Sequence, residues 1–290
     1  MITHPDRASA DQTRNDPHRC RTIGTTRSGH SPEWEERYRK QLLLAEIGPS
    51  GQEKLRQGSV LVVGCGGLGS TAALLLVRGG IGFLRLVDRD VVEVENLHRQ
   101  LLYNEADASE RIPKVVAAKR ELRAINEGVE IDACRSDVRQ GNIEDLLRGI
   151  DVTVDGTDNF RARCLINEAC VKLKKPWVYG GVVGTTGMAM MIVPGRGPCL
   201  WCLFPSAPED GVLPSSDRVG LVNTLPALIG AVQVTMAMKL LVGAQCEPGR
   251  LFQFDPWIGE YNQISVPRDP ACPVCVEQSF RFLGTPPEGS

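Results

Sequence analysis

The chain has 290 residues, of which 42% are hydrophobic and 23% charged, and its formal net charge is -2. This length and composition suit one large α/β domain or two small ones. A near-neutral chain gives no bulk electrostatic reason to expect nucleic acid or an anionic membrane as a partner. Ten cysteines without an apolar signal-peptide core favour reduced thiols and a cytoplasmic location.

Residues 1–32 are rich in Ser, Thr, Pro and Arg and hold almost no apolar side chains, which predicts a disordered tail. The arginines also suit a transit peptide, but such peptides avoid acids, and Asp6, Asp11 and Asp16 are present. A solvated tail is the favoured interpretation. The last residues, 284–290, are expected to form a flexible end.

The elements alternate along the chain. Periodicity and end signals predict helices at 32–43, 51–57, 71–78, 113–126, 159–172 and 222–242. Apolar or alternating runs predict strands at 60–63, 83–87, 129–134, 150–154, 177–183, 188–193, 251–255 and 263–266. The order predicts a Rossmann-like, mostly parallel sheet with helices on both faces, followed by a C-terminal antiparallel extension.

The segment from Val222 to Val242 is the most apolar in the chain. Pro226, Gln233 and Lys239 interrupt it, so it is interpreted as a buried core helix and not as a membrane span.

Glycines between a predicted strand and helix indicate a phosphate site. Gly64, Gly66 and Gly69 fit the G-x-G-x-x-G pattern, in which backbone N–H groups approach an anion at the helix start. Asp88 follows 19 residues beyond Gly69, at the end of the next strand, where it can bind ribose hydroxyls. Alone, this pattern predicts a mononucleotide or dinucleotide. A glycine turn needed only for packing is the alternative.

Three further side chains favour a triphosphate over the NAD of a dehydrogenase. Asn96 and Arg99 add an amide and a bidentate guanidinium shortly after Asp88. Lys114 opens a helix, where a cation is unfavourable unless an anion is bound. The chain also lacks the pattern of a second mononucleotide half. The alternatives are a helix cap for Asn96 and a surface ion pair for Arg99.

A carboxylate follows the strand at 150–154. Asp158 lies at the carboxyl end of the predicted sheet, where it could hold magnesium against phosphates. It could equally cap the next helix, and Asp155 is a competing magnesium ligand.

Two C-x-x-C pairs predict a metal centre. Four thiolates can surround zinc as a tetrahedron with bonds of about 2.3 Å, and a closed set of this kind is structural. A redox role fits less well because the pairs lie outside the βαβ core. The predicted zinc would staple the C-terminal strands to the segment after Pro194, and its ligands are Cys199, Cys202, Cys272 and Cys275.

Taken together, the motifs resemble the ubiquitin-activating-enzyme-like adenylating enzymes of the ThiF/MoeB/HesA family over roughly residues 33–280. That family binds ATP and magnesium and works as a homodimer. It adenylates the C-terminal Gly-Gly carboxylate of a ubiquitin-like sulfur carrier protein and releases pyrophosphate. The ordered motifs are Arg37-Tyr38-Arg39-Lys40-Gln41, GCGGLG at 64–69, D-x-D-x5-N-L-x-R-Q at 88–100, P-K at 113–114, T-D-N at 157–159 and the paired C-x-x-C.

The resemblance implies a role for each matched position. Arg99, Lys114 and Asp158 are the expected catalytic residues, with Asp158 holding magnesium and the cations offsetting charge at the α-phosphate. Asp88 would bind the ribose. The expected nucleotide-binding set is Gly64, Gly66, Gly67, Gly69, Asp88, Asp90, Asn96, Arg99, Lys114, Asp158, Asn159 and Lys40.

Two positions depart from the family pattern. The second Arg of its R-Y-x-R-Q motif, which typically reaches the partner subunit's ATP site, is replaced here by Lys40, which keeps the charge but loses the fork. Arg39 is adjacent but points about 100° away on a helix. Ser216 takes the place of a loop cysteine that joins the carrier or a sulfur donor in many relatives. We therefore expect adenylation without an enzyme thioester.

The expected organisation is an adenylation domain at 33–245 with a crossover loop near 205–221. Residues 246–283 would add the last strands and the second cysteine pair to the same domain. The substrate could instead be a tRNA base intermediate or a peptide, and near-neutral charge weighs against tRNA. An NAD-dependent dehydrogenase and a catalytically dead carrier-binding scaffold are the other hypotheses. The carrier and its pathway stay open.

Overall fold

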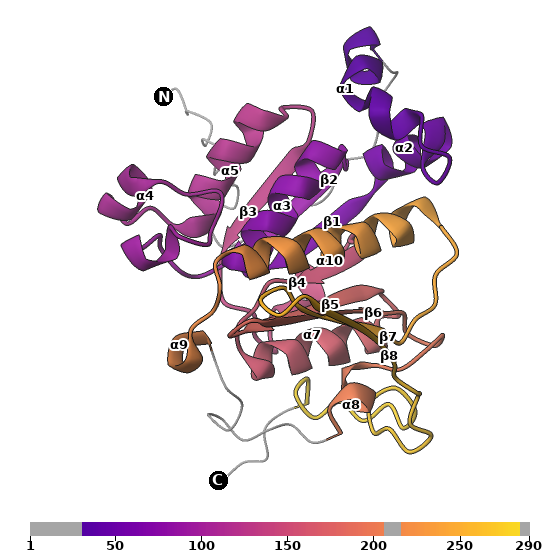
Figure 1. Ribbon diagram of the computed structural model, residues 1–290. Coiled ribbons are helices and arrows are strands. Elements are labelled where there is room, and N and C mark those ends of the chain that lie inside the picture. The colour runs from indigo at the N-terminus through magenta and orange to yellow at the C-terminus, as the bar shows by residue number, and fades with distance from the viewer. Residues whose placement is uncertain (1–30, 206–215, 285–290) are drawn as a thin grey trace, which may run out of the picture.

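A computed structural model describes residues 31–205 and 216–284 of the chain. The predicted N-terminal tail, flexible end and crossover loop fall mostly outside these ranges. Eight strands form one sheet in the order β3-β2-β1-β4-β5-β6-β7-β8 (Figure 1). Their bounds are β1 Ser59–Val63, β2 Phe83–Asp88, β3 Glu130–Arg135, β4 Val152–Asp155, β5 Trp177–Val183, β6 Thr186–Ile192, β7 Arg250–Asp255 and β8 Glu260–Ser265.

The sheet has a parallel part and an antiparallel part. Strands β1 to β5 are parallel, whereas β6, β7 and β8 each run antiparallel to the preceding strand. A tight connection between Val183 and Thr186 reverses the chain and pairs β5 with β6. The predicted fold class, a mostly parallel sheet with an antiparallel C-terminal extension, is confirmed.

The helices follow the predicted positions with small shifts. Pro113 and Asn159 cap their helices from outside instead of beginning them. Five short elements were not predicted, namely η2, α4, α6, α8 and α9. The described helices are α1 Pro32–Leu42, α2 Gly48–Gln57, α3 Gly67–Gly79, η2 Val94–Asn96, α4 Glu105–Ser109, α5 Lys114–Ile125, α6 Ile143–Leu146, α7 Phe160–Lys172, α8 Leu200–Leu203, α9 Ser216–Val219 and α10 Thr224–Val242.

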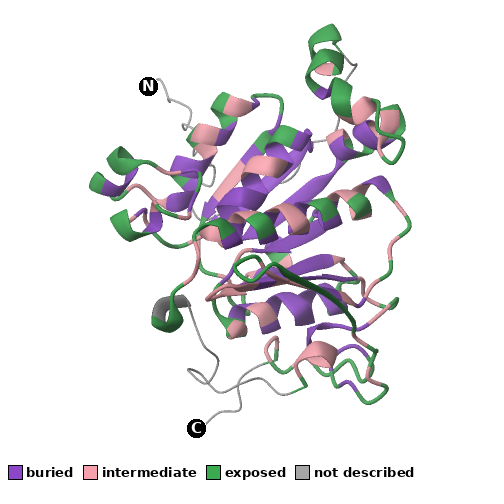
Figure 2. Cartoon of the chain, in the orientation of Figure 1, coloured by how far each residue is buried: buried purple, intermediate pink, exposed green. Residues whose placement is uncertain are grey.

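Both faces of the parallel strands are buried. Along β1, Val60 and Val62 pack with α3, α5 and α10, while Leu61 and Val63 pack on the opposite face with α6 and α7. Figure 2 shows the central strands buried along their length. The continuous apolar run of β1 thus reflects a strand covered on two sides.

Helix α10 lies across the sheet beside α3 (Figure 1). Among the described helices it alone is long and apolar enough to cross a membrane, but half of its most apolar window is buried inside the protein. Gln233 is fully buried and donates to the Asp155 carbonyl at 2.7 Å. These contacts agree with the prediction of a core helix.

Helix α1 is tied to the body by polar contacts from its motif. Ser31 caps it by accepting from the Trp34 N–H. Asn126 donates to the hydroxyl of the buried Tyr38 at 2.8 Å, and Arg37 donates to the Ile125 carbonyl at 3.0 Å. Two positions of the predicted motif, Arg37 and Tyr38, therefore anchor helix α1 to the residues at the end of α5.

Candidate active site

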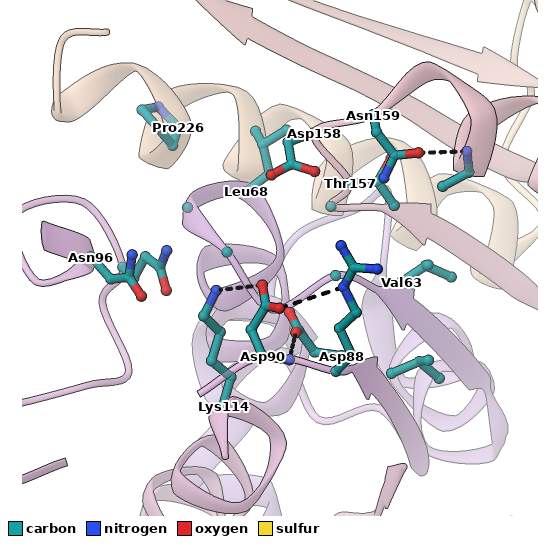
Figure 3. A pocket seen from close by; sticks show the side chains of 18 of the residues that line it. Val63, Leu68, Asp88, Asp90, Asn96, Lys114, Thr157, Asp158, Asn159 and Pro226 are labelled. Carbon is teal, nitrogen blue, oxygen red and sulfur yellow. Dashed lines mark hydrogen bonds and ion pairs between the residues drawn. The ribbon is translucent and has the colours of Figure 1, made fainter. Parts of the chain in front are cut away.

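A pocket of about 330 Å³ opens where the carboxyl ends of β1, β2 and β4 meet. Figure 3 shows acidic, basic and amide side chains from separate loops directed into it. Two residues of the predicted nucleotide set, Gly69 and Lys40, do not line it. The predicted residues that do are Gly64, Gly66, Gly67, Asp88, Asp90, Asn96, Arg99, Lys114, Asp158 and Asn159.

The glycine loop serves both packing and access. Gly64 has φ of +85°, and a Cβ there would lie 2.6 Å from the Gly156 carbonyl oxygen. A Cβ on Gly69 would lie 1.7 Å from the Gly64 oxygen, so Gly69 allows α3 to meet the loop backbone. Helix α3 begins at Gly67 without a side-chain cap, which leaves N–H groups at its start for an anion.

Asp88, Asp90 and Lys114 form a linked acid–base group. The Asp88 carboxylate accepts from the Cys65 N–H at 2.7 Å and the Asp90 N–H at 2.8 Å. Burial raises the pKa of Asp88, and the nearby Lys114 ammonium and the two amides oppose that rise. Lys114 is only 7% exposed, and its Nζ lies 3.2 Å from an Asp90 oxygen. A buried cation with one partially exposed partner suits a pocket that receives an anion.

Asn96 and Arg99 lie on and after the short helix η2. The Asn96 side chain accepts from the Glu93 N–H at 3.1 Å, so it caps η2 and lines the pocket at once. Arg99 donates to the Glu95 carbonyl at 2.7 Å. Within residues 31–205 and 216–284 no carboxylate pairs with Arg99. The structure therefore does not support the alternative in which Arg99 forms a surface ion pair.

Asn159, not Asp158, caps helix α7. Its Oδ1 accepts from the Ala162 N–H at 2.8 Å. Asp158 is exposed and directed into the pocket (Figure 3). The competing acid, Asp155, is fully buried and accepts from Arg163 and from the Thr157 hydroxyl. Asp158 is therefore the carboxylate placed to meet a cation at the phosphates, since magnesium is usually held by one or two carboxylates plus phosphate oxygens.

Gln100 and Arg163 are pocket residues that were not among the predicted site residues. Gln100 is 3% exposed, and its Oε1 is buried without a hydrogen-bond partner. Its position next to Arg99 in the D-x-D-x5-N-L-x-R-Q motif could have marked Gln100 as a pocket residue. Arg163 lines the pocket and pairs with Asp155 at 3.0 Å. Nothing in the sequence near Arg163 marked it.

The four predicted cysteine ligands come together on the face of the sheet that α6 and α7 cover. Their sulfurs all lie within 4.8 Å of one another, and the pairs Cys199–Cys272 and Cys202–Cys275 are 3.6 Å apart. Zinc bonds of about 2.3 Å give tetrahedral sulfur–sulfur edges of about 3.8 Å, whereas a disulfide needs about 2.05 Å. The set therefore fits zinc in a closed, structural site.

Metal binding here would be coupled to proton release. Burial raises the pKa of the Cys202 thiol to about 11 and raises that of Cys199 further. The Asp269 N–H donates to Cys202 Sγ at 3.5 Å, which favours the thiolate. The four thiols come together only in the folded chain. A metal that displaces their protons would therefore bind the folded state and stabilise it.

Lys40 and Arg39 are both exposed on α1, which projects from one end of the molecule (Figure 1). Because neither lines the pocket of its own chain, contact with a nucleotide would require the site of another copy.

The sheet and the charged pocket at its carboxyl edge define a Rossmann-type nucleotide-binding protein. Residues 38–274 match the ThiF family model, so the chain belongs to the ThiF family. This confirms the predicted family.

Named relatives refine the class. The chain is 42% identical over 250 residues to the sulfur carrier protein ThiS adenylyltransferase of Bacillus subtilis (strain 168), covering 85% of this chain and 73% of that protein. It is 39% identical to the sulfur carrier protein adenylyltransferase of Thermus thermophilus, covering 84% and 91%. These relatives confirm the predicted enzyme class, a nucleotidyltransferase.

Solved structures share the fold. The crystal structure of E. coli MccB with MccA-N7isoASN superposes with a TM-score of 0.70 at 23% identity, covering 82% of this chain and 74% of that one. The structure of E. coli MccB with ATP gives a TM-score of 0.69 at 22% identity, covering 78% and 69%.

Proposed function

We propose that the protein adenylates the C-terminal Gly-Gly carboxylate of a ubiquitin-like sulfur carrier protein, using ATP and magnesium and releasing pyrophosphate. The observation that carries the proposal is Lys114, a buried ammonium at a helix start that also lines the pocket with Arg99. Cations so placed can offset charge at an attacked α-phosphate. The relatives named as sulfur carrier protein adenylyltransferases support the same substrate class.

The reaction needs little covalent help from the enzyme. A carrier carboxylate oxygen would bond to the α-phosphorus of ATP while the bond from that phosphorus to the bridging oxygen breaks, and pyrophosphate leaves with the electron pair. Asp88 would hold the ribose. Arg99, Lys114 and Asn96 would bind the phosphates, and Asp158 would hold magnesium that offsets their charge.

An exposed apolar face supports a protein substrate. Trp257 is 74% exposed and Ile258 62%, both in the β7–β8 hairpin, and Tyr261 follows on β8. By strand register, this hairpin lies at the same edge of the sheet as Val182, which lines the pocket. Exposed apolar patches of this kind mark protein contacts. A carrier docked here would have its tail near the nucleotide.

We further infer that no enzyme thioester forms, because Ser216 stands where many relatives carry a loop cysteine. The nucleotide-binding set, magnesium, a cytoplasmic homodimer and the contact of Lys40 across subunits belong to the same proposal.

Pyrophosphate release tests the proposal. Wild-type protein is incubated with ATP, magnesium and carriers ending in Gly-Gly, with carriers lacking the last two glycines as controls. The intact carriers should stimulate release, and mass spectrometry should find no carrier bound to the enzyme through a reducible bond. If no carrier stimulates release and Arg99→Ala leaves background hydrolysis unchanged, the proposal fails. Stimulation by a short peptide instead would point to the peptide alternative.

A further inference from the structure

An aromatic chain links the cysteine centre to the nucleotide pocket. Phe204 is the C-cap of α8 and follows Cys202 by two residues. Its ring packs edge-on against Phe160, the first residue of α7, at 5.5 Å and against Tyr179 of β5 at 6.0 Å. The Arg163 guanidinium lies over the Tyr179 ring at 5.4 Å. Phe204 thus lies between the start of α7 and the ring of Tyr179, which in turn contacts the pocket residue Arg163.

Arg163 in turn fixes the backbone next to Asp158. It donates to the carbonyls of Thr157 at 2.7 Å and Gly180 at 3.1 Å while pairing with Asp155. The Asn159 cap fixes the other side of Asp158. The position of Asp158 therefore depends on Arg163 and on the first turn of α7.

Helix α7 is also tied to both halves of the cysteine centre farther along. Asn167 accepts from the N–H of Leu200, which lies within the first C-x-x-C pair, at 3.0 Å. Glu168 accepts from the N–H groups of Phe282 and Leu283, which follow the second pair, at 2.7 and 3.0 Å. Figure 1 shows α7 and α8 below the sheet. One rigid helix therefore spans the distance from the four sulfurs to the pocket.

We propose that Phe204 is a positioning residue through which the cysteine centre sets Asp158 and Arg163 at the nucleotide pocket. Closely packed interiors transmit such displacements because they contain few voids to absorb them. Removing the Phe204 ring would release the start of α7, and Asp158 would lose its fixed position while the sulfurs stay together. The inference rests on the proposed role of Asp158 in holding magnesium.

Three variants separate this role from general stability. Phe204→Ala removes the ring, and Phe204→Tyr keeps it. Phe282→Ala is the matched control because its ring packs on Trp201 of the same helix α8. Phe204→Leu keeps an apolar side chain and replaces Phe204→Ala if the latter does not fold. Each purified protein is first analysed for zinc, and all are expected to keep the wild-type amount.

The first measurement is amide hydrogen exchange in the absence of nucleotide. In Phe204→Ala, exchange at residues 157–163 should accelerate while exchange in β1 stays as in wild type. The second measurement is the magnesium concentration needed for half-maximal thermal protection by ATP. Removal of a supporting contact typically costs at least about tenfold in metal affinity, so this concentration should rise about tenfold. Phe204→Tyr should restore both values, and Phe282→Ala should leave both unchanged.

Wild-type exchange at 157–163 and an unchanged magnesium requirement in Phe204→Ala would overturn the inference. Equal effects of Phe282→Ala would also overturn it, because the coupling would then be general loosening. The exchange measurement needs neither ATP nor a carrier. It therefore tests the inference even if pyrophosphate release shows that the proposed function is wrong.

Discussion

Lys114 and Asp90 are joined twice. The Lys114 ammonium lies 3.2 Å from an Asp90 carboxylate oxygen, and the Lys114 N–H donates to the Asp90 carbonyl at 2.9 Å. The backbone bond fixes the helix start against the loop after β2, while the side-chain pair leaves Asp90 half exposed to water. The ammonium is thus held at the pocket by a partner that water can solvate.

Lys114→Met should therefore separate activity from stability. The methionine keeps a similar length and leaves Asp90 solvated, and the Cys65 and Asp90 N–H groups still bind the Asp88 carboxylate. The melting temperature should therefore change little. Loss of a group that stabilises charge in the transition state should lower kcat/KM for pyrophosphate release by about 100-fold or more. Lys119→Met on the same helix makes the same chemical change and should keep wild-type activity. A large drop in melting temperature for Lys114→Met would contradict this account.

Asp158 and Asn159 are adjacent, but substitutions at the two positions should affect different properties of the protein. Asp158→Asn should raise the magnesium concentration needed for activity by about tenfold or more. The melting temperature should change little, because Asp158 is not the helix cap. Asn159→Ala removes the cap and should cost about 1 kcal/mol, or about 2–4 °C in melting temperature. Magnesium titrations and thermal melts of both variants check this pair. The reverse result would return the capping role to Asp158.

Glu168 should make the stability depend on pH. Its side chain is fully buried, Oε1 has no hydrogen-bond partner, and burial raises the pKa of its carboxyl despite the amides of Phe282 and Leu283. Because the folded-state pKa lies above the unfolded one, this contribution to stability is complete below the unfolded pKa of about 4.3. It is lost as the pH rises through the folded pKa.

Glu168→Gln removes that titration. The melting temperature of the variant should exceed that of wild type at neutral pH, and the difference should vanish near pH 4. Glu144→Gln is the control, since Glu144 forms an exposed pair with Lys172 at 2.7 Å that should contribute little. Melts across this pH range give the answer. A pH-independent difference would mean that the amide acts through packing alone.

Zinc should be bound at one ion per chain and should stabilise the fold. Cys272→Ser removes a buried ligand and should lower the melting temperature by roughly 10 °C or more, because structural zinc contributes several kcal/mol to folding. Cys246→Ser lies outside the cluster and should retain both zinc and stability. Metal analysis and thermal melts measure these effects. A wild-type protein that is stable after complete zinc removal would show that the centre is not structural.

Trp257 should govern carrier binding without affecting ATP. Trp257→Ala removes a highly exposed ring from the proposed docking face and should raise the KM for the carrier about tenfold, the effect of losing about 1.4 kcal/mol. Thermal protection by ATP and magnesium should remain. Val116→Ala, an exposed apolar residue on α5, should change neither value. An unchanged carrier KM in Trp257→Ala would move the docking site elsewhere.

The parallel half of the fold could be predicted because its elements are long enough to show a period. The continuous apolar run from Val60 to Val63 predicts a buried strand. Helix α10 has 19 residues, which is long enough to be predicted from its apolar sequence. The helices η2, α4 and α8 hold three to five residues, fewer than a periodic pattern needs. They form because neighbouring loops and side-chain caps fix them, as Asn104 does for α4.

The candidate site divides in the same way. Asn96, Arg99 and Lys114 could be found because ordered motifs carry them. Arg163 could not, because its partners Asp155 and Gly180 approach it only when β4 and β5 pair in the sheet. Sequence also could not choose between Asp158 and Asn159 as the cap, since both side chains suit the position.

The contact of Gly64, Gly69 and Gly156 limits what the glycine loop can reveal about chemistry. Their backbones meet so closely that any side chain would strike main-chain atoms at 1.7 to 2.6 Å. Selection for folding alone would therefore keep these positions invariant, even in a descendant that had lost catalysis. Drift would first erase the charged positions, Arg99, Lys114 and Asp158. A degenerate copy of this gene would keep its glycine signature long after its charged side chains had been replaced.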